Sequence, residues 1–376
     1  KTCLVFQDLV HAAYARFGVI LLGLFAQDDG GDVLCLNPLG QRGGRIEMAA
    51  LTGLAGISRE ERQLDQVKSW LLRGCPGGGG PDNARTGDAG FSVSLRGAHK
   101  TLRHVLVIGE NECLPTLVEN TGQFCPGVAF TVLVQGRDRA RLLARQLKER
   151  WGCGLEENAD DLLRSHASLK GDRIVTVHGA EDDLMYSLTT DPRITASRFD
   201  AAVFLADNAA PDPDAQNLLW IFKLLELVDQ RQLSVGDRFH TLAEILSSTK
   251  GDLVEKRAVT AQGRPVRVLS TQKLRTYFMA HCCFVPNLHR VYEELVAPTG
   301  MTFVQVRIDH LAKPIPFSQL LDALALRGVI PVGFDGCPDA DTPRLIVNPL
   351  AGGGQDVVDP QRVRNLYVLT SKESLT

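Results

Sequence analysis

One stretch of this sequence occurs twice, and this repeat limits the possible folds more than any other feature. Residues 6–39 read FQDLVHAAYARFGVILLGLFAQDDGGDVLCLNPL, and residues 317–350 read FSQLLDALALRGVIPVGFDGCPDADTPRLIVNPL. A one-residue gap and a one-residue insertion align the glycines and the Asn-Pro pairs. Each copy predicts an amphipathic helix that ends at a glycine, an apolar strand, an acidic turn, and a second strand that ends at a proline. The repeat therefore predicts a duplication, with a period far too long for a solenoid.

The sequence between the two copies predicts a linker and then an α/β domain. Residues 73–90 are rich in Gly and Pro, which is typical of a linker or mobile loop. From residue 104 onward, short apolar runs alternate with amphipathic segments, so we predict a Rossmann-like parallel sheet covered by helices on both faces. The predicted strands are 104–108, 129–134, 174–177, 201–205 and 241–246, and the predicted helices are 114–120, 138–150, 183–188 and 214–228.

Two further amphipathic segments lie on either side of Pro286 and predict a pair of helices joined by a sharp turn. Such a pair cannot bury both of its apolar faces on itself and on the sheet alone. We therefore predict a contact between subunits. Its candidate residues are Tyr277, Phe278, Val291 and Leu295.

Composition excludes several classes of protein. Lys plus Arg number 41 and Asp plus Glu number 44, so the net charge of −3 argues against a nucleic-acid binder held by phosphate contacts. The nine cysteines include no Cys-x-x-Cys pair, which favours reduced thiols over a disulfide scaffold or a zinc ribbon. No apolar run approaches the roughly 20 residues of a membrane-spanning helix.

The first turn of the predicted sheet departs from the pattern of a dinucleotide site. The turn that follows residues 104–108 keeps only Gly109 of the expected Gly-x-Gly-x-x-Gly, so Gly109 is the one candidate for cofactor binding. Glu110 and Glu112 would repel a phosphate there. We therefore predict a scaffold that has lost NAD binding. Because no nucleophile or metalloprotease motif is present either, we predict that the chain is not an enzyme.

Acidic residues gather where the predicted strands end, at 181–183 and again at 207–214. Clustered carboxylates hold hard cations such as Ca²⁺. The alternative is that these acids cap helices and favour turns. The candidate cation ligands are Glu110, Glu112, Asp182 and Asp207, because these should converge at the mouth of the cleft.

Taken together, these segments resemble the regulator of potassium conductance (RCK) domain. The segment YFMAHCCFVPNLHRVYEEL at 277–295 is most similar to the Castor/Pollux group of ion channels, and tandem domains of this kind also occur in Slo-type channels. The matching parts are 105–109 for the first strand, 178–182 for the end of the third, 202–206 for the fourth, 272–296 for the crossover helices and 301–370 for the small lobe.

The resemblance implies a tandem arrangement in which the first repeat is the small lobe of a preceding domain. The implied parts are 1–60 (small lobe of the first domain), 61–100 (linker), 101–265 (Rossmann-like lobe of the second), 266–300 (helix-turn-helix crossover) and 301–376 (second small lobe).

The resemblance also implies a function. We expect a ligand-sensing gating-ring domain of a cation channel that binds Ca²⁺, another cation or a small ligand and forms a homotetrameric ring. The fragment itself would be soluble, at the cytosolic face of a membrane, with the potassium pore upstream of Lys1 or on another chain. Two alternatives stay open: an NAD-dependent oxidoreductase with a degenerate site, and a soluble regulatory subunit of a potassium transporter.

Overall fold

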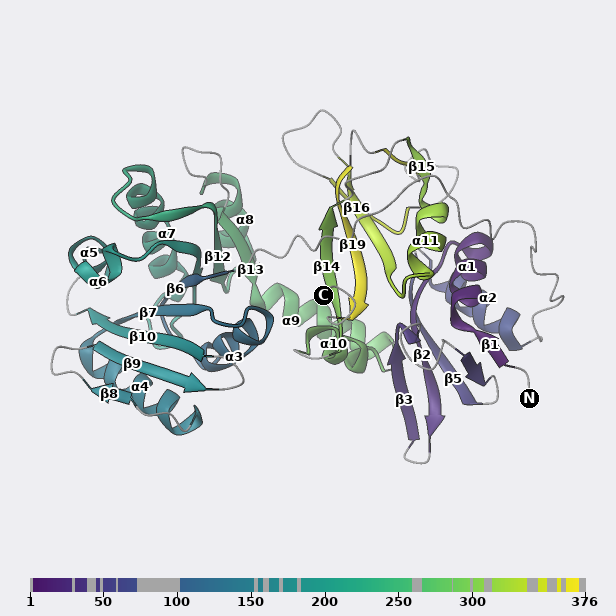
Figure 1. Ribbon diagram of the computed structural model, residues 1–376, viewed down its shortest axis with the longest axis horizontal. Coiled ribbons are helices and arrows are strands. Elements are labelled where there is room, and N and C mark those ends of the chain that lie inside the picture. The colour runs from purple at the N-terminus through teal and green to yellow at the C-terminus, as the bar shows by residue number, and fades with distance from the viewer. Residues whose placement is uncertain are drawn as a thin grey trace. The chain divides into compact units, whose positions relative to one another are not determined.

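The computed structural model divides the chain into two compact units, and most of their elements are labelled in Figure 1. Unit 1 contains residues 1–99 and 287–376, and unit 2 contains residues 100–286. The described residues are 3–28, 31–38, 45–47, 50–58, 60–72, 102–151, 155–157, 162–168, 172–180, 184–258, 266–285, 287–297, 300–307, 313–336, 344–349, 357–359 and 363–371.

Unit 2 is built on a sheet of eight strands in the order β13-β12-β11-β6-β7-β10-β9-β8. The six strands from β13 to β10 are parallel, and β9 and β8 extend the sheet in antiparallel pairing. The predicted Rossmann-like α/β fold is confirmed. The strands are β6 (His104–Ile108), β7 (Ala129–Gln135), β8 (Leu155–Glu157), β9 (Leu162–Ser168), β10 (Asp172–Ala180), β11 (Phe199–Phe204), β12 (Val235–Ile245) and β13 (Val266–Ser270).

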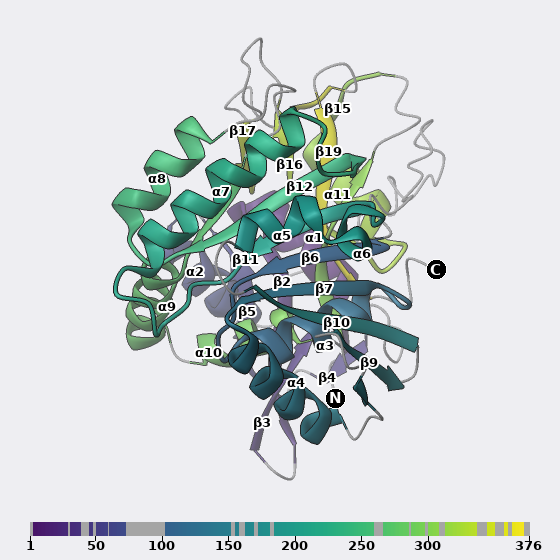
Figure 2. The same cartoon turned by 90° about the vertical axis from the view of Figure 1, so that its left-hand side faces the viewer.

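Helices cover both faces of this sheet, which is why its central strands are apolar on both sides. In β6, Val105 and Val107 face the core under α3 and α4, while Leu106 and Ile108 face the core under α5, α7 and α8. Figure 2 shows these two layers. The helices are α3 (Leu114–Phe124), α4 (Arg137–Trp151), α5 (Leu184–Thr190), α6 (Pro192–Thr195), α7 (Pro213–Asp229), α8 (Ser248–Arg257) and α9 (Thr271–Phe284).

Unit 1 contains the same small fold twice, so the sequence repeat is confirmed as a structural one. In each copy a helix is followed by a three-stranded antiparallel arrangement, in the order β3-β2-β5 or β17-β16-β19, and two short strands pair separately. The first lobe is β1 (Cys3–Val5), α1 (Phe6–Phe17), β2 (Ile20–Asp28), β3 (Gly31–Leu36), β4 (Arg45–Glu47) and β5 (Leu51–Ile57); the second lobe is β15 (Ile315–Pro316), α11 (Phe317–Ala325), β16 (Ile330–Gly336), β17 (Arg344–Val347), β18 (Val357–Val358) and β19 (Val363–Ser371).

Three further elements complete unit 1. Strand β14 (Met301–Arg307) pairs with β19 at the edge of the second lobe, and α10 (Leu288–Val296) contacts β14 and β3. Helix α2 (Glu61–Leu72) buries Val67 and Leu71 in the core of unit 1. The predicted linker at 61–100 is therefore corrected at its start, because residues 61–72 are a packed helix. The rest of that range lies outside the described residues. The assignment of the parts to two RCK-like domains stays a prediction.

The two lobes agree down to individual residues. Gly23 and Gly333 each follow an irregularity in strand pairing, and a Cβ at either would collide with a backbone carbonyl of the neighbouring strand. Asn37 and Asn348, from the two Asn-Pro pairs, both have left-handed backbone, with φ of 41° and 47°. Their backbone N–H groups donate to carbonyls at equivalent positions, those of Leu22 (2.7 Å) and Val332 (2.9 Å).

The two lobes bind each other through reciprocal contacts. Asn37 Nδ2 donates to the carbonyl of Gly328 (2.7 Å), and its counterpart Asn348 donates to the carbonyl of Gly18 (2.9 Å). His11 lies 2.6 Å from Asp322, the equivalent position of the other lobe. Such reciprocity is the pattern of a two-fold symmetric dimer, here formed within one chain.

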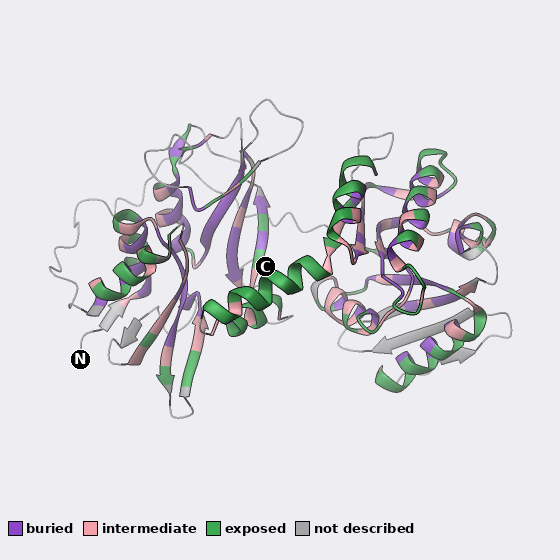
Figure 3. Ribbon diagram, turned by 180° about the vertical axis from the view of Figure 1, so that it is seen from behind, coloured by how far each residue is buried: buried purple, intermediate pink, exposed green. Residues whose placement is uncertain are grey.

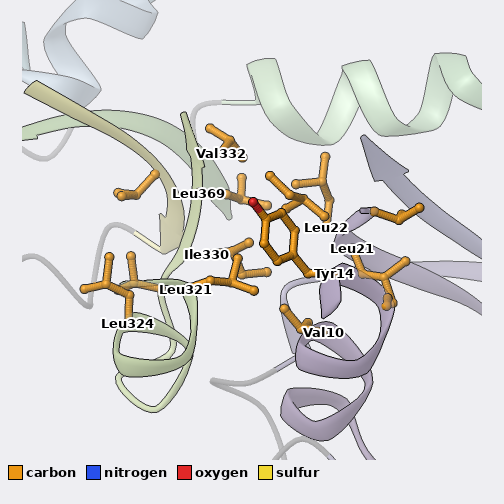
Figure 4. Packing of buried hydrophobic residues seen from close by; sticks show 14 of the residues in the cluster. Val10, Tyr14, Leu21, Leu22, Leu321, Leu324, Ile330, Val332 and Leu369 are labelled. Atoms are coloured by element: carbon orange, nitrogen blue, oxygen red, sulfur yellow. The ribbon is translucent and has the colours of Figure 1, made fainter. Parts of the chain in front are cut away.

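One hydrophobic core joins the two lobes. Tyr14 of α1 lies between Val10 and Leu21 of the first lobe and Leu321 and Ile330 of the second (Figure 4). Its hydroxyl donates a hydrogen bond to the carbonyl of Pro349. Because neither lobe has a separate core, removing one of them would expose the apolar surface of the other.

Candidate functional site

The candidate site lies where the strand order of unit 2 reverses. Strands β6, β7 and β10 run to one side of the sheet and β11, β12 and β13 to the other, so the reversal falls between β6 and β11. Open α/β sheets bind ligands in the crevice outside the carboxyl ends of the strands at this point. The loops that form it follow β6 and β11, beside the first turn of α4.

Gly109 is required by the close approach of these two loops. Its φ is +89°, and a Cβ there would lie 2.6 Å from the carbonyl oxygen of Leu205. Its amide donates to the carbonyl of Leu133 (2.9 Å). These contacts give the glycine a packing role, and its predicted role in binding a cofactor stays a prediction.

A guanidinium joins two of the predicted cation ligands. Arg139, in the first turn of α4, donates from Nε to Glu110 Oε1 (2.5 Å) and from Nη1 to Asp207 Oδ2 (2.6 Å). Glu110 follows β6, Asp207 follows β11, and Asp207 is buried. The structure therefore brings these two acids together, as the sequence predicted, with a side chain of the same chain between them.

The two acids differ in strength. Burial raises the pKa of Glu110 above its ordinary value, although the charge of Arg139 opposes the shift. Burial also acts to raise the pKa of Asp207, but the hydrogen bonds from Arg139 and from the Ala209 amide hold this pKa below its ordinary value. The hydrogen bond to Asp207 is also the largest cause of the raised pKa of Arg139.

A second group of hydrogen bonds ties the same loops together. Asn111 Nδ2 donates to Glu244 Oε2 (2.8 Å) and to the carbonyl of Ala206 (3.1 Å), and the Ala206 amide donates to the same Glu244 oxygen (3.0 Å). Asn111 Oδ1 accepts from the amide of Cys113, just before α3 (3.0 Å). This hydrogen bond holds the loop that leads into α3, and the predicted loss of dinucleotide binding stays a prediction.

Of the other two predicted cation ligands, only Glu112 lies in the described part of the chain, and it does not join this arrangement. Glu112 is exposed. The pKa of Cys113 is raised mainly by burial, then by the charge of Glu244, and least by the charge of Glu112. Asp182 lies outside the described residues. Among the residues that the structure describes, no group of three or more His, Cys, Asp or Glu side chains is placed to hold a metal ion.

Sequence reasoning missed Arg139, Asn111 and Glu244. Arg139 belongs to a helix whose basic residues are typical of a solvated face. Two of these residues carried a signal: Arg139 lies in the first turn of the helix predicted after the strand at 129–134, and Glu244 is the one charged residue in the apolar run 241–246.

Helix α9 carries two of the predicted interface residues and has no buried residue. Tyr277 is 54% exposed and Phe278 is 37% exposed, and Leu274 and Met279 are exposed beside them. Figure 3 shows this helix as exposed along its length. Its apolar side chains are therefore positioned to contact another molecule.

The other two predicted interface residues require a correction. Val291 of α10 is only 9% exposed and belongs to the core of unit 1, and Leu295 packs against that core. Arg290 of the same helix donates to the carbonyl of Asp32 (2.6 Å). Val291 and Leu295 are therefore used in packing within unit 1, so these two side chains do not form a free surface for a second subunit.

Comparisons with known proteins place few limits on this chain. No protein-family model matches it, and no curated protein matches it. One of the solved structures that match is described as "GsuK channel bound to NAD", with 11% sequence identity and a TM-score of 0.27. The alignment covers 98% of this chain and 48% of that chain, so the present chain spans about half the length of that structure. In the described part of the chain, no helix has the length and apolar character needed to cross a membrane.

Proposed function

We propose that this chain is a ligand-sensing regulatory module of a cation channel, of the gating-ring type. The resemblance of its sequence to RCK domains supports this proposal. So do the Rossmann-like sheet, the crevice crossed by an ion pair network, and the duplicated lobes. The proposed ligand is Ca²⁺, another cation or a small molecule, and the proposed activity is regulation rather than catalysis.

The exposure of α9 is the observation that carries the proposal. Most helices in proteins are stabilised by packing of an apolar face rather than by intrinsic propensity. Helix α9 has 14 residues, five large apolar side chains at or above one-third exposure, and no buried residue. A partner that covers this helix would bury these exposed side chains. In a ring, that partner is another subunit of the same protein.

Ligand binding would act on such a ring through the crevice. A ligand shifts a ring between two shapes only by its difference in affinity for them. The crevice lies between loops that belong to the two halves of the sheet. A ligand held by both loops would therefore favour one spacing of these halves over another.

Assembly size tests the proposal. Phe278→Asp places a charge on the apolar face of α9, and light scattering should show smaller assemblies than those of the wild-type protein. Leu142→Asp is the matched control, because Leu142 is also an exposed apolar residue of unit 2 but lies on α4. An unchanged mass for the Phe278→Asp protein contradicts the proposal.

The Rossmann-like sheet also favours the oxidoreductase alternative, which a binding measurement separates from the first. Strong enhancement of NADH fluorescence by the protein would favour the oxidoreductase. Its absence, with a smaller assembly for Phe278→Asp, would favour the regulatory module. Partitioning of the native protein into membranes would distinguish a channel from a soluble regulatory subunit of a transporter.

A further inference from the structure

The crevice of unit 2 already contains a cation, and the cation belongs to the chain itself. Arg139 reaches from α4, which follows β7, to acids in two other loops. Its Nε is 2.5 Å from Glu110 in the loop after β6, and its Nη1 is 2.6 Å from Asp207 in the loop after β11. One side chain thus ties together three segments at the carboxyl ends of the strands.

A second arginine of the same helix shows that this arrangement is not an ordinary surface ion pair. Arg150 also donates two hydrogen bonds, but both go to the carboxylate of one residue, Glu119 (2.7 and 3.0 Å). Surface pairs of that kind contribute little to stability. Arg139 instead divides its donors between two acids from different loops, and Asp207 is buried. Charge-assisted hydrogen bonds are stronger and shorter than neutral ones.

The position of the guanidinium has a consequence for any ligand of the crevice. Glu110 and Asp207 are the acids that an incoming cation would need, and the guanidinium occupies oxygen atoms of both. A cation must therefore displace Arg139 before it can bind both carboxylates. Displacement would also release the loop after β6 from the loop after β11.

We propose that Arg139 is an autoinhibitory latch, which closes the crevice by occupying Glu110 and Asp207 and opens when a cationic ligand competes for these acids. This inference rests on the proposed function, since it concerns regulation of the same crevice.

Two variants of α4 test the latch. Arg139→Gln removes the charge and keeps much of the side-chain length. Arg150→Gln is the control, because it makes the same change at an arginine that pairs, among the described residues, with the carboxylate of Glu119 alone. In Arg139→Gln, amides at 205–212 should exchange hydrogen at least about tenfold faster, as expected for loss of charge-assisted bonds. Calorimetric titration should also show Ca²⁺ binding at least about tenfold tighter than in the wild-type protein. Both measurements should be unchanged in Arg150→Gln.

The outcomes separate the latch from the proposed function. Unchanged exchange or unchanged Ca²⁺ affinity in a folded Arg139→Gln protein overturns the latch, while the proposed function is judged separately by the assembly size of Phe278→Asp. If Arg139→Gln does not fold by circular dichroism, Arg139→Lys serves instead. Lysine keeps the charge but lacks the planar fork that reaches two acids, so both effects should be present and smaller. Wild-type behaviour of Arg139→Lys in both measurements then overturns the latch.

Discussion

At the scale of single residues, two asparagines at equivalent positions make equivalent hydrogen bonds between the two lobes. Asn37 and Asn348 adopt left-handed backbone, which asparagine tolerates better than most residues. Each side chain then crosses to the glycine carbonyl that follows the helix of the other lobe. The Asn-Pro pairs visible in the sequence are thus the points at which the lobes are joined.

Replacing these asparagines with glycine should measure that junction, because glycine keeps the backbone conformation and removes only the side chain. Among the described residues, the side chain of Asn348 donates to two carbonyls, those of Gly18 and Ile57, whereas the side chain of Asn37 donates to one. We expect Asn348→Gly to lower the free energy of unfolding by about 1–3 kcal/mol, and by more than Asn37→Gly. Chemical denaturation provides the comparison. Wild-type stability in Asn348→Gly would show that the junction does not depend on these bonds.

The acid Asp207 should make the stability of unit 2 depend on pH. Its pKa in the folded protein lies below the ordinary value of 3.8, despite the opposing effect of burial, because Arg139 and the Ala209 amide donate to it. The carboxylate therefore stabilises the fold above about pH 4, and this contribution is lost as the pH falls through the folded pKa.

The expected result is a difference in unfolding free energy between the wild-type protein and Asp207→Asn that is largest near about pH 6 and shrinks toward about pH 3. Asp252→Asn, at an exposed position of α8, is the control and should show little difference at any pH. A difference for Asp207→Asn that does not change with pH would argue against the ion pair.

At the scale of elements, apolar patterns predicted most of the central sheet. The runs at 104–108 and 129–134 became β6 and β7 because strands covered on both faces are apolar throughout. Strands β9 and β13 escaped prediction, since LLRSHAS and VRVLS mix polar with apolar residues as strands away from the centre of a sheet do. Helix α8 escaped because it contains Gly251, whose missing side chain allows contact with Val268 of β13.

The candidate site could be predicted only in part, for a similar reason. Strand ends locate Glu110 and Asp207 at one edge of the sheet, because parallel strands share a carboxyl edge. The sequence does not indicate that Arg139 lies between them. That position depends on where α4 packs, and local periodicity carries no information about it. Asp214, an acid of the same region, instead accepts hydrogen bonds from the amides of Leu246 and Ser247.

The close approach of the loops after β6 and β11 can be tested by comparing the stability of two glycine-to-alanine variants. Gly109 and Gly127 both have positive φ, but a Cβ at Gly127 meets nothing within 4 Å. Gly127→Ala should therefore cost only the conformational penalty, about 1–2 kcal/mol. Gly109→Ala should cost more, because its Cβ would also collide with the Leu205 carbonyl. Equal losses of unfolding free energy in the two variants would mean that the loops are not in contact.

At the scale of the whole molecule, the sequence predicted two lobes but not their association. A sequence repeat indicates that two segments have the same fold, but it does not indicate that the two segments share one hydrophobic core. One hydrophobic core, which includes Tyr14 and Val291 of α10, extends through both lobes of unit 1. The paired asparagines add hydrogen bonds between the lobes. The apolar surfaces of the lobes are therefore used within the chain. Among the helices that the structure describes, α9 is the one without a buried residue, and the proposed contact with a second subunit is placed there for that reason.

The contact of His11 with Asp322 has a consequence for how such a protein can change over time. In a dimer of identical chains, a residue on the symmetry axis meets its own copy, so a histidine there faces a histidine. Here the two halves are encoded separately, and unlike residues meet at equivalent positions. Tyr14 likewise reaches across to Pro349, while the equivalent position in the second lobe is Ala325. Joining the halves in one gene leaves each free to acquire substitutions that the other does not share.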